Sequence, residues 1–162
     1  YTPVSDPDYG GGNGDAYLDM IESELKPLVD SELRTLPGVA DTAIMGSSLG
    51  GLISSYAGLE RADTFGLMGA MSPSTWWNDG WLVDEVKTTP PKAARPLRVY
   101  VDSGTPGDGS AETRRLAQAY RTLGYVDDAD LMYVAQPGAQ HNEGYWAQRL
   151  PAALAFLLGP GR

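Results

Sequence analysis

The sequence predicts an α/β fold built on a parallel sheet. Helical and strand-like segments alternate along the chain, one helix followed by four strand–helix pairs. Such alternation is typical of parallel strands joined by crossover helices. A second observation agrees with the first, because the apolar run 43–45 leads into Gly46-Ser47-Ser48-Leu49-Gly50. This G-x-S-x-G spacing is typical of a nucleophile elbow, a sharp turn from a buried strand into a helix.

The composition is that of one globular domain, which we expect to span residues 1–162. Hydrophobic residues make up 42% and charged residues 20% of the chain, enough for a sizeable core. The net charge of −9 argues against nucleic acid or an anionic membrane as a partner. No apolar run approaches the roughly 18 residues of a membrane span. Cysteine is absent, which excludes disulfides and thiol chemistry. Cysteine usage therefore does not indicate whether the protein belongs to a reducing or an oxidising compartment.

The N-terminal part predicts a loop followed by an amphipathic helix. Residues 1–14 are rich in glycine and proline and show no periodicity, as in a loop. From Asp15 onward, apolar residues recur at helical spacing. Pro27 should end or kink this helix near Leu25. The expected inward positions are Leu18, Ile21, Leu25, Leu28 and Val29.

Four short apolar segments predict the strands of the sheet: 42–45, 66–71, 97–101 and 131–135. The helices between and after them are expected at 50–60, 79–87 and 110–123, with a last helix that contains Trp146, Leu150, Leu154 and Leu157 and stops at Gly159. Ser110 can cap the third of these helices, and Pro151 should kink the last. Residues 88–96 contain three prolines and predict a surface linker.

An activated serine needs a base within hydrogen-bond reach and an acid that orients that base. His141 is the only histidine, and it follows the last predicted strand. It is therefore the candidate base for Ser48. Asp108 is the favoured acid, because it lies in the glycine-rich loop after the third strand; Asp102 at the strand end and Glu112 in the next helix remain alternatives. Ser…Asp…His is the order along the chain in α/β-hydrolases.

Three further features belong to the candidate site. The backbone N–H of Leu49, the residue after the nucleophile, is the expected oxyanion donor. A second donor normally follows an earlier strand, and the loop from Tyr9 to Gly14 is the segment that could approach the site. Side chains expected at the substrate pocket are Ser47, Trp76, Trp77 and Trp146, although core packing explains the adjacent tryptophans equally well. This chemistry needs no metal or organic cofactor.

Four ordered motifs resemble the putative-esterase family of α/β-hydrolases, which includes esterase D, enterobactin esterases, feruloyl esterases and the mycolyltransferase antigens. The motifs are residues 44–51, 71–77, 99–105 and 138–143, with Trp146 and 149–151. The resemblance implies Ser48 as nucleophile and His141 as base. Two departures stand out. The family typically has a glutamate two residues after its Gly-Thr pair, whereas Asp108 comes three after Thr105, and the family's N-terminal half, with four strands, has no counterpart here.

This second departure has a physical consequence. In the family, the nucleophile strand is paired on both sides, so here the strand 42–45 would be left as an apolar sheet edge. An exposed edge of this kind invites association. We therefore expect another polypeptide, either a second copy or a separate N-terminal piece, to cover it.

Taken together, the residues and the resemblance predict a serine carboxylic-ester hydrolase that works through an acyl-enzyme on a small-molecule ester. Two alternatives remain open. A truncated hydrolase fold could serve as a non-catalytic interaction module, and the same Ser48, His141 and Asp108 could transfer the acyl group to an alcohol instead of water.

Overall fold

The computed structural model describes residues 1–90 and 97–159 and contains the predicted parallel sheet. Its strands are β3 (Ala43–Ser47), β4 (Leu67–Met71), β5 (Arg98–Thr105) and β6 (Leu131–Pro137). They lie in the order β3-β4-β5-β6, and every neighbouring pair is parallel. Each strand begins within one residue of its expected start, while β5 runs four residues further than expected. The α/β fold with a parallel sheet is therefore confirmed.

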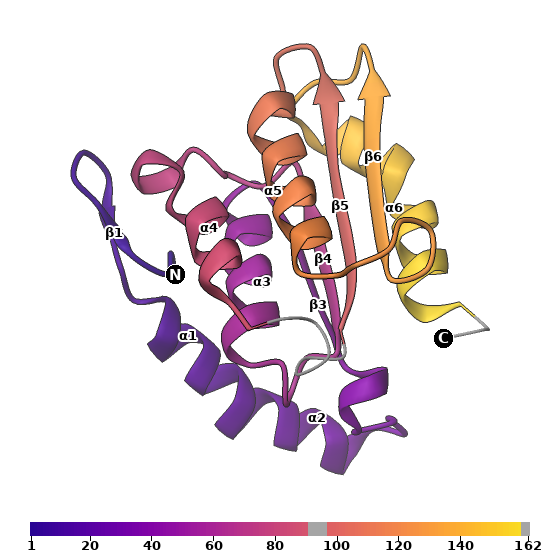
Figure 1. Cartoon of the computed structure of the whole chain (residues 1–162). Helices are drawn as coiled ribbons and strands as arrows, with labels where there is room; N and C mark the ends of the chain where they lie inside the picture. The colour runs from indigo at the N-terminus through magenta and orange to yellow at the C-terminus, as the bar shows by residue number, and fades with distance from the viewer. Residues whose placement is uncertain (91–96, 160–162) are drawn as a thin grey trace.

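Helices cover both faces of this sheet (Figure 1). The helical segments are α1 (Gly14–Met20), the π-helical turn η1 (Ile21–Leu25), α2 (Lys26–Glu32), the short 3-10 turn η2 (Val39–Asp41), α3 (Leu49–Glu60), α4 (Trp77–Thr88), α5 (Ser110–Thr122) and α6 (Glu143–Leu158). Helices α3, α4 and α5 lie on one face, and α6 lies on the other. Because the strands are parallel, their carboxyl ends lie at the same edge of the sheet, and the loops that follow them meet there. The expected linker 88–96 falls largely outside the described residues.

The core follows the two-residue period of the strands. On β5, Val99 and Val101 pack among the side chains of α3, α4 and α5, whereas Tyr100 between them faces α6. All three are fully buried. Met68 and Ala70 of β4 alternate with their neighbours in the same way. Two apolar layers therefore hold the sheet rigidly from both sides.

The N-terminal segment differs from the expectation in three respects. The expected loop contains a short hairpin of β1 (Ser5–Asp6) and β2 (Gly10–Gly11). The helix does not end near Pro27; it continues through the π-helical turn η1, and Pro27 falls in the first turn of α2, where a missing N–H costs little. Leu25 and Leu28, expected to face inward, are 47% and 59% exposed.

The start of α5 differs from the expectation, whereas α6 ends at the predicted glycine. Gly109, in the left-handed conformation at φ +63°, occupies the cap position of α5, so Ser110 is the first helical residue rather than the cap. Helix α6 is a single α-helix that runs through Pro151 and stops at Gly159. At its start, the Asn142 side chain accepts hydrogen bonds from the backbone N–H groups of Gly144 and Tyr145. This cap fixes the end of the loop that carries His141.

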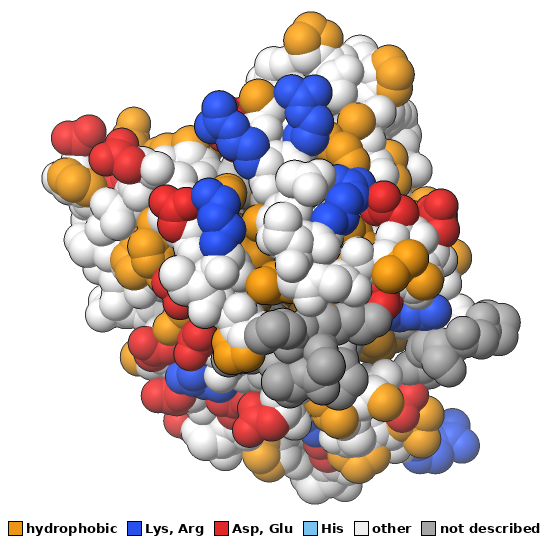
Figure 2. All heavy atoms as spheres, viewed as in Figure 1, with side chains coloured by type: hydrophobic (Ala, Val, Ile, Leu, Met, Phe, Trp, Pro, Cys, Tyr) orange, Lys and Arg blue, Asp and Glu red, His pale blue; other side chains and the backbone are white. Residues whose placement is uncertain are grey.

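The surface is mixed in charge. On the face shown in Figure 2, Lys and Arg side chains gather over α4 and α5, and Asp and Glu side chains gather over the N-terminal helices. Arg61, at the end of α3, forms ion pairs with Asp15, Asp19 and Glu22, which fasten the N-terminal helical segment to the sheet domain. Within the part of the chain that the structure describes, no helix is both long and apolar enough to cross a membrane.

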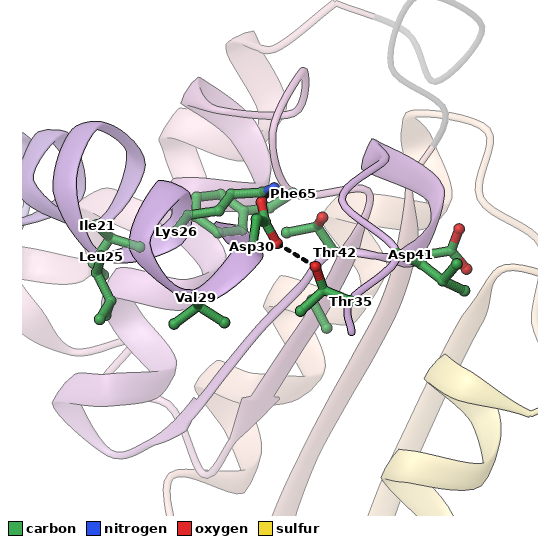
Figure 3. A pocket seen from close by; sticks show the side chains of 11 residues that line it. Ile21, Leu25, Lys26, Val29, Asp30, Thr35, Asp41, Thr42 and Phe65 are labelled. Atoms are coloured by element: carbon green, nitrogen blue, oxygen red, sulfur yellow. Dashed lines mark hydrogen bonds and ion pairs between the residues drawn. The ribbon is translucent and has the colours of Figure 1, made fainter. Parts of the chain in front are cut away.

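Strand β3 forms one end of the sheet. Its described partner is β4, and no described strand pairs with its other side. A groove of about 470 Å³ lies between this strand and the N-terminal helices. Figure 3 shows that Ile21, Leu25, Val29 and Phe65 give this groove apolar walls, while a hydrogen bond joins Thr35 to Asp30. Within residues 1–90 and 97–159, the sheet edge predicted from 42–45 is thus unpaired on one side and borders an apolar groove.

Candidate active site

Ser48 occupies the turn between β3 and α3 in a strained backbone conformation. Its φ of 57° and ψ of −121° lie in a region that residues other than glycine rarely adopt. Such strain costs on the order of 1–3 kcal/mol and persists only where the surroundings enforce it. Here Ser48 N–H donates to the Met71 carbonyl at 3.0 Å, and the Ser48 carbonyl accepts from Leu52 and Ser74 at 3.1 and 3.0 Å. The turn lifts the Ser48 side chain above the sheet edge.

The two glycines of the motif have different roles. A Cβ placed on Gly46 would lie 2.6 Å from the carbonyl carbon and 2.7 Å from the carbonyl oxygen of Gly50. Side-chain atoms do not approach backbone that closely, so the helix could not start above the strand. A Cβ on Gly50 meets nothing within 4 Å. Gly46 is therefore required by packing, whereas Gly50 is not.

This difference gives a prediction about stability. Gly46→Ala is expected to lower the free energy of unfolding by about 1–3 kcal/mol, because it overpacks rigid backbone. Gly50→Ala, its matched control inside the helix, is expected to raise it by up to about 1 kcal/mol. Urea unfolding followed by circular dichroism measures both, and equal midpoints for the two variants would contradict the assignment.

His141 lies between Ser48 and Asp108. Its Nε2 atom is 2.9 Å from Ser48 Oγ, and its Nδ1 atom is 2.6 Å from Asp108 Oδ1. A carboxylate can only accept, so Nδ1 carries the ring hydrogen and Nε2 is free to accept the Ser48 hydroxyl hydrogen. The three side chains come from the loops that follow β3, β5 and β6. The chain thus brings together residues that are 93 and 33 positions apart.

Asp108 is the carboxylate at hydrogen-bond distance from the histidine. Its side chain is fully buried, whereas that of His141 is 45% exposed toward solvent. Asp102, the alternative acid, does not end its strand as expected: it lies inside β5, which continues to Thr105, and it forms an ion pair with Arg149 at 3.0 Å. Glu112 lies in the first turn of α5. The buried acid and the open imidazole have the arrangement that activation of a hydroxyl requires.

Asp102 is a second buried carboxyl group near this site. Burial raises the pKa of the Asp102 carboxyl, and the Arg149 guanidinium, the Tyr100 hydroxyl and the Ser72 N–H act against that rise. Burial, followed by the Asp102 charge, raises the pKa of Tyr100 far above its usual range. Tyr100 therefore remains a hydroxyl donor to Asp102 Oδ2, at 2.8 Å.

A cavity of about 410 Å³ opens beside the Ser48 hydroxyl. Its walls include Ser74, Trp76 and His141, and Trp76 is 49% exposed at the rim. Trp77 does not line it, contrary to the expectation for a pocket residue. The Trp77 ring is buried, and its Nε1–H donates to the Val4 carbonyl at 2.9 Å. Neighbouring side chains at a helix start point in different directions, so one tryptophan reaches the cavity and the other enters the core.

Ser47 and Trp146 lie on another side of the histidine. Both line a separate groove of about 420 Å³, together with the apolar side chains of Met45, Met71 and Leu150. The Trp146 ring meets the His141 ring edge to face at 5.0 Å. Trp146 thus contacts the candidate base itself.

The expected oxyanion donor has a suitable position. Leu49 is the first residue of α3, where a backbone N–H has no partner within the helix. The N-terminal hairpin reaches the rim of the cavity, because the Tyr9 ring packs edge-on against Trp76 at 5.5 Å. In the described ranges, no group of three or more His, Cys, Asp or Glu side chains is arranged to hold a metal ion.

The sequence indicated no role for Ser72 and Arg149, whose side chains lie next to the Asp108 carboxylate. Ser72 Oγ lies 2.6 Å from Asp108 Oδ2, and Arg149 is 4% exposed. One signal was present in the sequence. Arg149 shares the inward face of α6 with Ala153, Phe156 and Leu157, and an arginine at such a position requires a buried partner.

Comparisons with known proteins give the family of the chain. Residues 2–157 match the family model described as "Putative esterase". The protein YbbA of Bacillus subtilis, described as uncharacterized, is 27% identical over 161 residues, which cover 94% of this chain and 63% of that protein. A siderophore triacetylfusarinine C esterase of Aspergillus fumigatus is 34% identical over 85 residues, covering 52% of this chain and 29% of that protein.

Solved structures give the same picture. The enterobactin esterase of Shigella flexneri, determined in the presence of 2,3-dihydroxy-N-benzoyl-serine, superposes with a TM-score of 0.78 at 25% identity. The match covers 91% of this chain and 39% of that one. The chain therefore spans less than two thirds of the length of these relatives. Because the family model extends over nearly all of the sequence, the chain belongs to the putative-esterase family, within the α/β-hydrolase-like folds.

Proposed function

We propose that this chain carries the reactive centre of a serine carboxylic-ester hydrolase. One observation carries the proposal: Ser48 Oγ, His141 and Asp108 form a continuous hydrogen-bonded chain of 2.9 and 2.6 Å beside an open cavity. A hydroxyl bonded to a neutral imidazole, itself oriented by a carboxylate, is the arrangement that activates an alcohol for attack on an ester carbonyl.

The proposed reaction has two halves. Ser48 Oγ bonds to the carbonyl carbon while His141 Nε2 takes the hydroxyl proton, and the Leu49 N–H stabilises the negative oxygen that forms. The intermediate collapses to the acyl-enzyme, and His141 returns the proton to the departing alcohol. Water then attacks the acyl carbon with His141 as base, which releases the acid and restores Ser48. Asp108 orients the imidazole throughout.

The test is hydrolysis of short-chain nitrophenyl esters, together with labelling by a fluorophosphonate, which reacts with activated serines. We expect turnover and one label per chain. Because relatives of this chain are named enterobactin esterases, enterobactin is a further ester to assay beside these probes. Absence of both turnover and label would favour the alternative of a non-catalytic interaction module. Product analysis with a competing alcohol distinguishes hydrolysis from acyl transfer, since the same acyl-enzyme serves both.

We further propose that an extended segment of another polypeptide pairs with the free side of β3 and covers the adjoining apolar groove. Unpaired strand edges associate readily, and Leu36 beside this edge is 67% exposed. Sedimentation velocity of the purified protein is expected to give a mass above the 17.3 kDa of one chain. Mass spectrometry of the same material distinguishes a second copy from a different polypeptide.

The variant that tests this association is Ala43→Lys, which places a charge at the exposed start of β3. Edge lysines oppose pairing with another strand. We expect the variant to sediment closer to 17.3 kDa. A wild-type protein that sediments as a single monomer, with rapid hydrogen exchange at the β3 amides, would refute the proposal.

A further inference from the structure

A buried polar cluster centred on the Ser72 hydroxyl lies directly behind Asp108. Ser72 follows β4 and is 1% exposed. Its Oγ atom is within hydrogen-bond distance of three groups: Asp108 Oδ2 at 2.6 Å, Arg149 at 2.9 Å and Trp146 Nε1 at 3.0 Å. A hydroxyl has one hydrogen to donate and two lone pairs to accept with. The capacity of this hydroxyl is therefore completely used.

The chemistry of the three partners fixes the direction of each bond. A guanidinium and an indole N–H can only donate, so Arg149 and Trp146 occupy both lone pairs of the Ser72 oxygen. Its hydrogen must then point to Asp108 Oδ2. The same carboxylate oxygen accepts the Gly104 N–H at 2.6 Å. Two donors thus hold Oδ2, which leaves Oδ1 to face His141.

A second carboxylate keeps this cluster in place. Asp102 Oδ1 accepts the backbone N–H of Ser72 at 3.0 Å, and Asp102 Oδ2 lies 3.0 Å from Arg149 Nε. Asp102 therefore holds both the backbone of the serine and the guanidinium that bonds to its hydroxyl. Ser72 itself has a φ of 39°, so its position depends on such contacts.

We propose that Ser72, held by Arg149 and Trp146, is a positioning residue that fixes the Asp108 carboxylate toward His141 Nδ1. It acts through Asp108 and does not touch the reacting atoms. The proposal rests on the proposed role of Ser48 as nucleophile. Its consequence is that the hydrogen of the imidazole stays on Nδ1, so that Nε2 remains free to take the Ser48 proton.

The first measurement is the tautomer of His141 by 15N nuclear magnetic resonance. His141 is the only histidine, so its ring gives one set of signals. We expect the Nδ1–H tautomer in the wild-type protein and a mixture of tautomers in Ser72→Ala. We also expect kcat to fall by about 10- to 100-fold with KM changed less than about twofold, because misorientation of a catalytic group affects the chemical step.

Ser103→Ala is the matched control. Ser103 is also fully buried, on β5, but its hydroxyl has no hydrogen-bond partner within the described residues. We expect it to keep both the tautomer and kcat. Trp146→Phe is the second variant, for use if Ser72→Ala does not fold. It removes the indole N–H from the cluster and keeps a smaller aromatic ring at this position, so a smaller change in the same direction is expected.

A double-mutant cycle tests whether Ser72 acts through Asp108. In an Asp108→Asn background, Ser72→Ala is expected to lower kcat by less than about twofold, since the carboxylate to be positioned is gone. Multiplicative losses, or a folded Ser72→Ala with the wild-type tautomer and kcat, would overturn the proposal. If the wild-type protein hydrolyses no ester, the function proposed above fails, while the tautomer measurement still decides the role of Ser72.

Discussion

Ser48→Ala is expected to abolish ester hydrolysis while leaving the fold intact. Loss of a catalytic serine typically lowers kcat by about 10⁴- to 10⁶-fold. Here Ser48 Oγ is the oxygen that contacts His141 Nε2. Ser74 Oγ lies 3.4 Å from Ser48 Oγ but is 3% exposed and forms part of the cavity wall, so we do not expect it to replace the nucleophile.

The measurement is turnover of a nitrophenyl ester together with the intact mass after fluorophosphonate treatment. Ser48→Ala should take up no label and give a wild-type circular dichroism spectrum. Ser31→Ala on α2, an exposed serine whose hydroxyl donates to the Leu28 carbonyl, is the control and should keep full turnover and labelling. Hydrolysis that persists in Ser48→Ala would remove this serine from the mechanism.

Asp108→Asn is expected to lower kcat by about 10³- to 10⁴-fold with little effect on KM. The reason is geometric. The Gly104 N–H and the Ser72 hydroxyl both donate to Oδ2, so the amide oxygen of asparagine takes that place. The amide NH₂ then faces His141 Nδ1, which must accept. The ring hydrogen moves to Nε2, and Nε2 no longer accepts the Ser48 proton.

Two further variants make this test specific. Asp84→Asn, at a side chain that is 75% exposed, should leave kcat unchanged. Asp102→Asn is expected to act on stability, because it weakens the pairing of the buried Arg149; leaving a buried charge unpaired costs about 3–5 kcal/mol. Because the amide oxygen in this variant can still accept the Ser72 N–H, we expect the His141 tautomer to shift less than in Ser72→Ala. A loss of kcat in folded Asp102→Asn equal to that in Asp108→Asn would contradict the separate roles given to the two carboxylates.

The sheet was predictable because its pattern is local. Runs of apolar residues separated by glycine, proline and helical periodicity mark β3 to β6 to within a residue at their starts. The helix starts were less predictable. Ser110 has the residue type of a cap, yet Gly109 takes that place because the preceding loop arrives in a left-handed conformation. The path of a loop depends on contacts with residues distant in the sequence, so the preferences of its own residues do not predict it.

Burial could not be predicted where the answer depends on what lies opposite. Leu25 and Leu28 have the spacing of a buried face, but the described residues place too little against them, and they remain exposed. Trp76 and Trp77 are chemically identical neighbours, yet Trp77 is buried with its N–H bonded to Val4, whereas Trp76 stays half exposed beside Tyr9. Periodicity shows that a face is apolar; it does not show which surface covers it.

The sequence by itself determined the family, the order of strands along the chain, and a short set of candidates, with Ser48 in its elbow and His141 as the single histidine. These follow from motifs that are contiguous in the chain. Only the tertiary structure decided which carboxylate faces the histidine and that Ser72 and Arg149 stand behind it. Asp102 and Asp108 are both loop-end carboxylates by sequence. Their difference arises where β4, β5 and α6 converge, because a buried charge takes its role from the donors that the fold places around it.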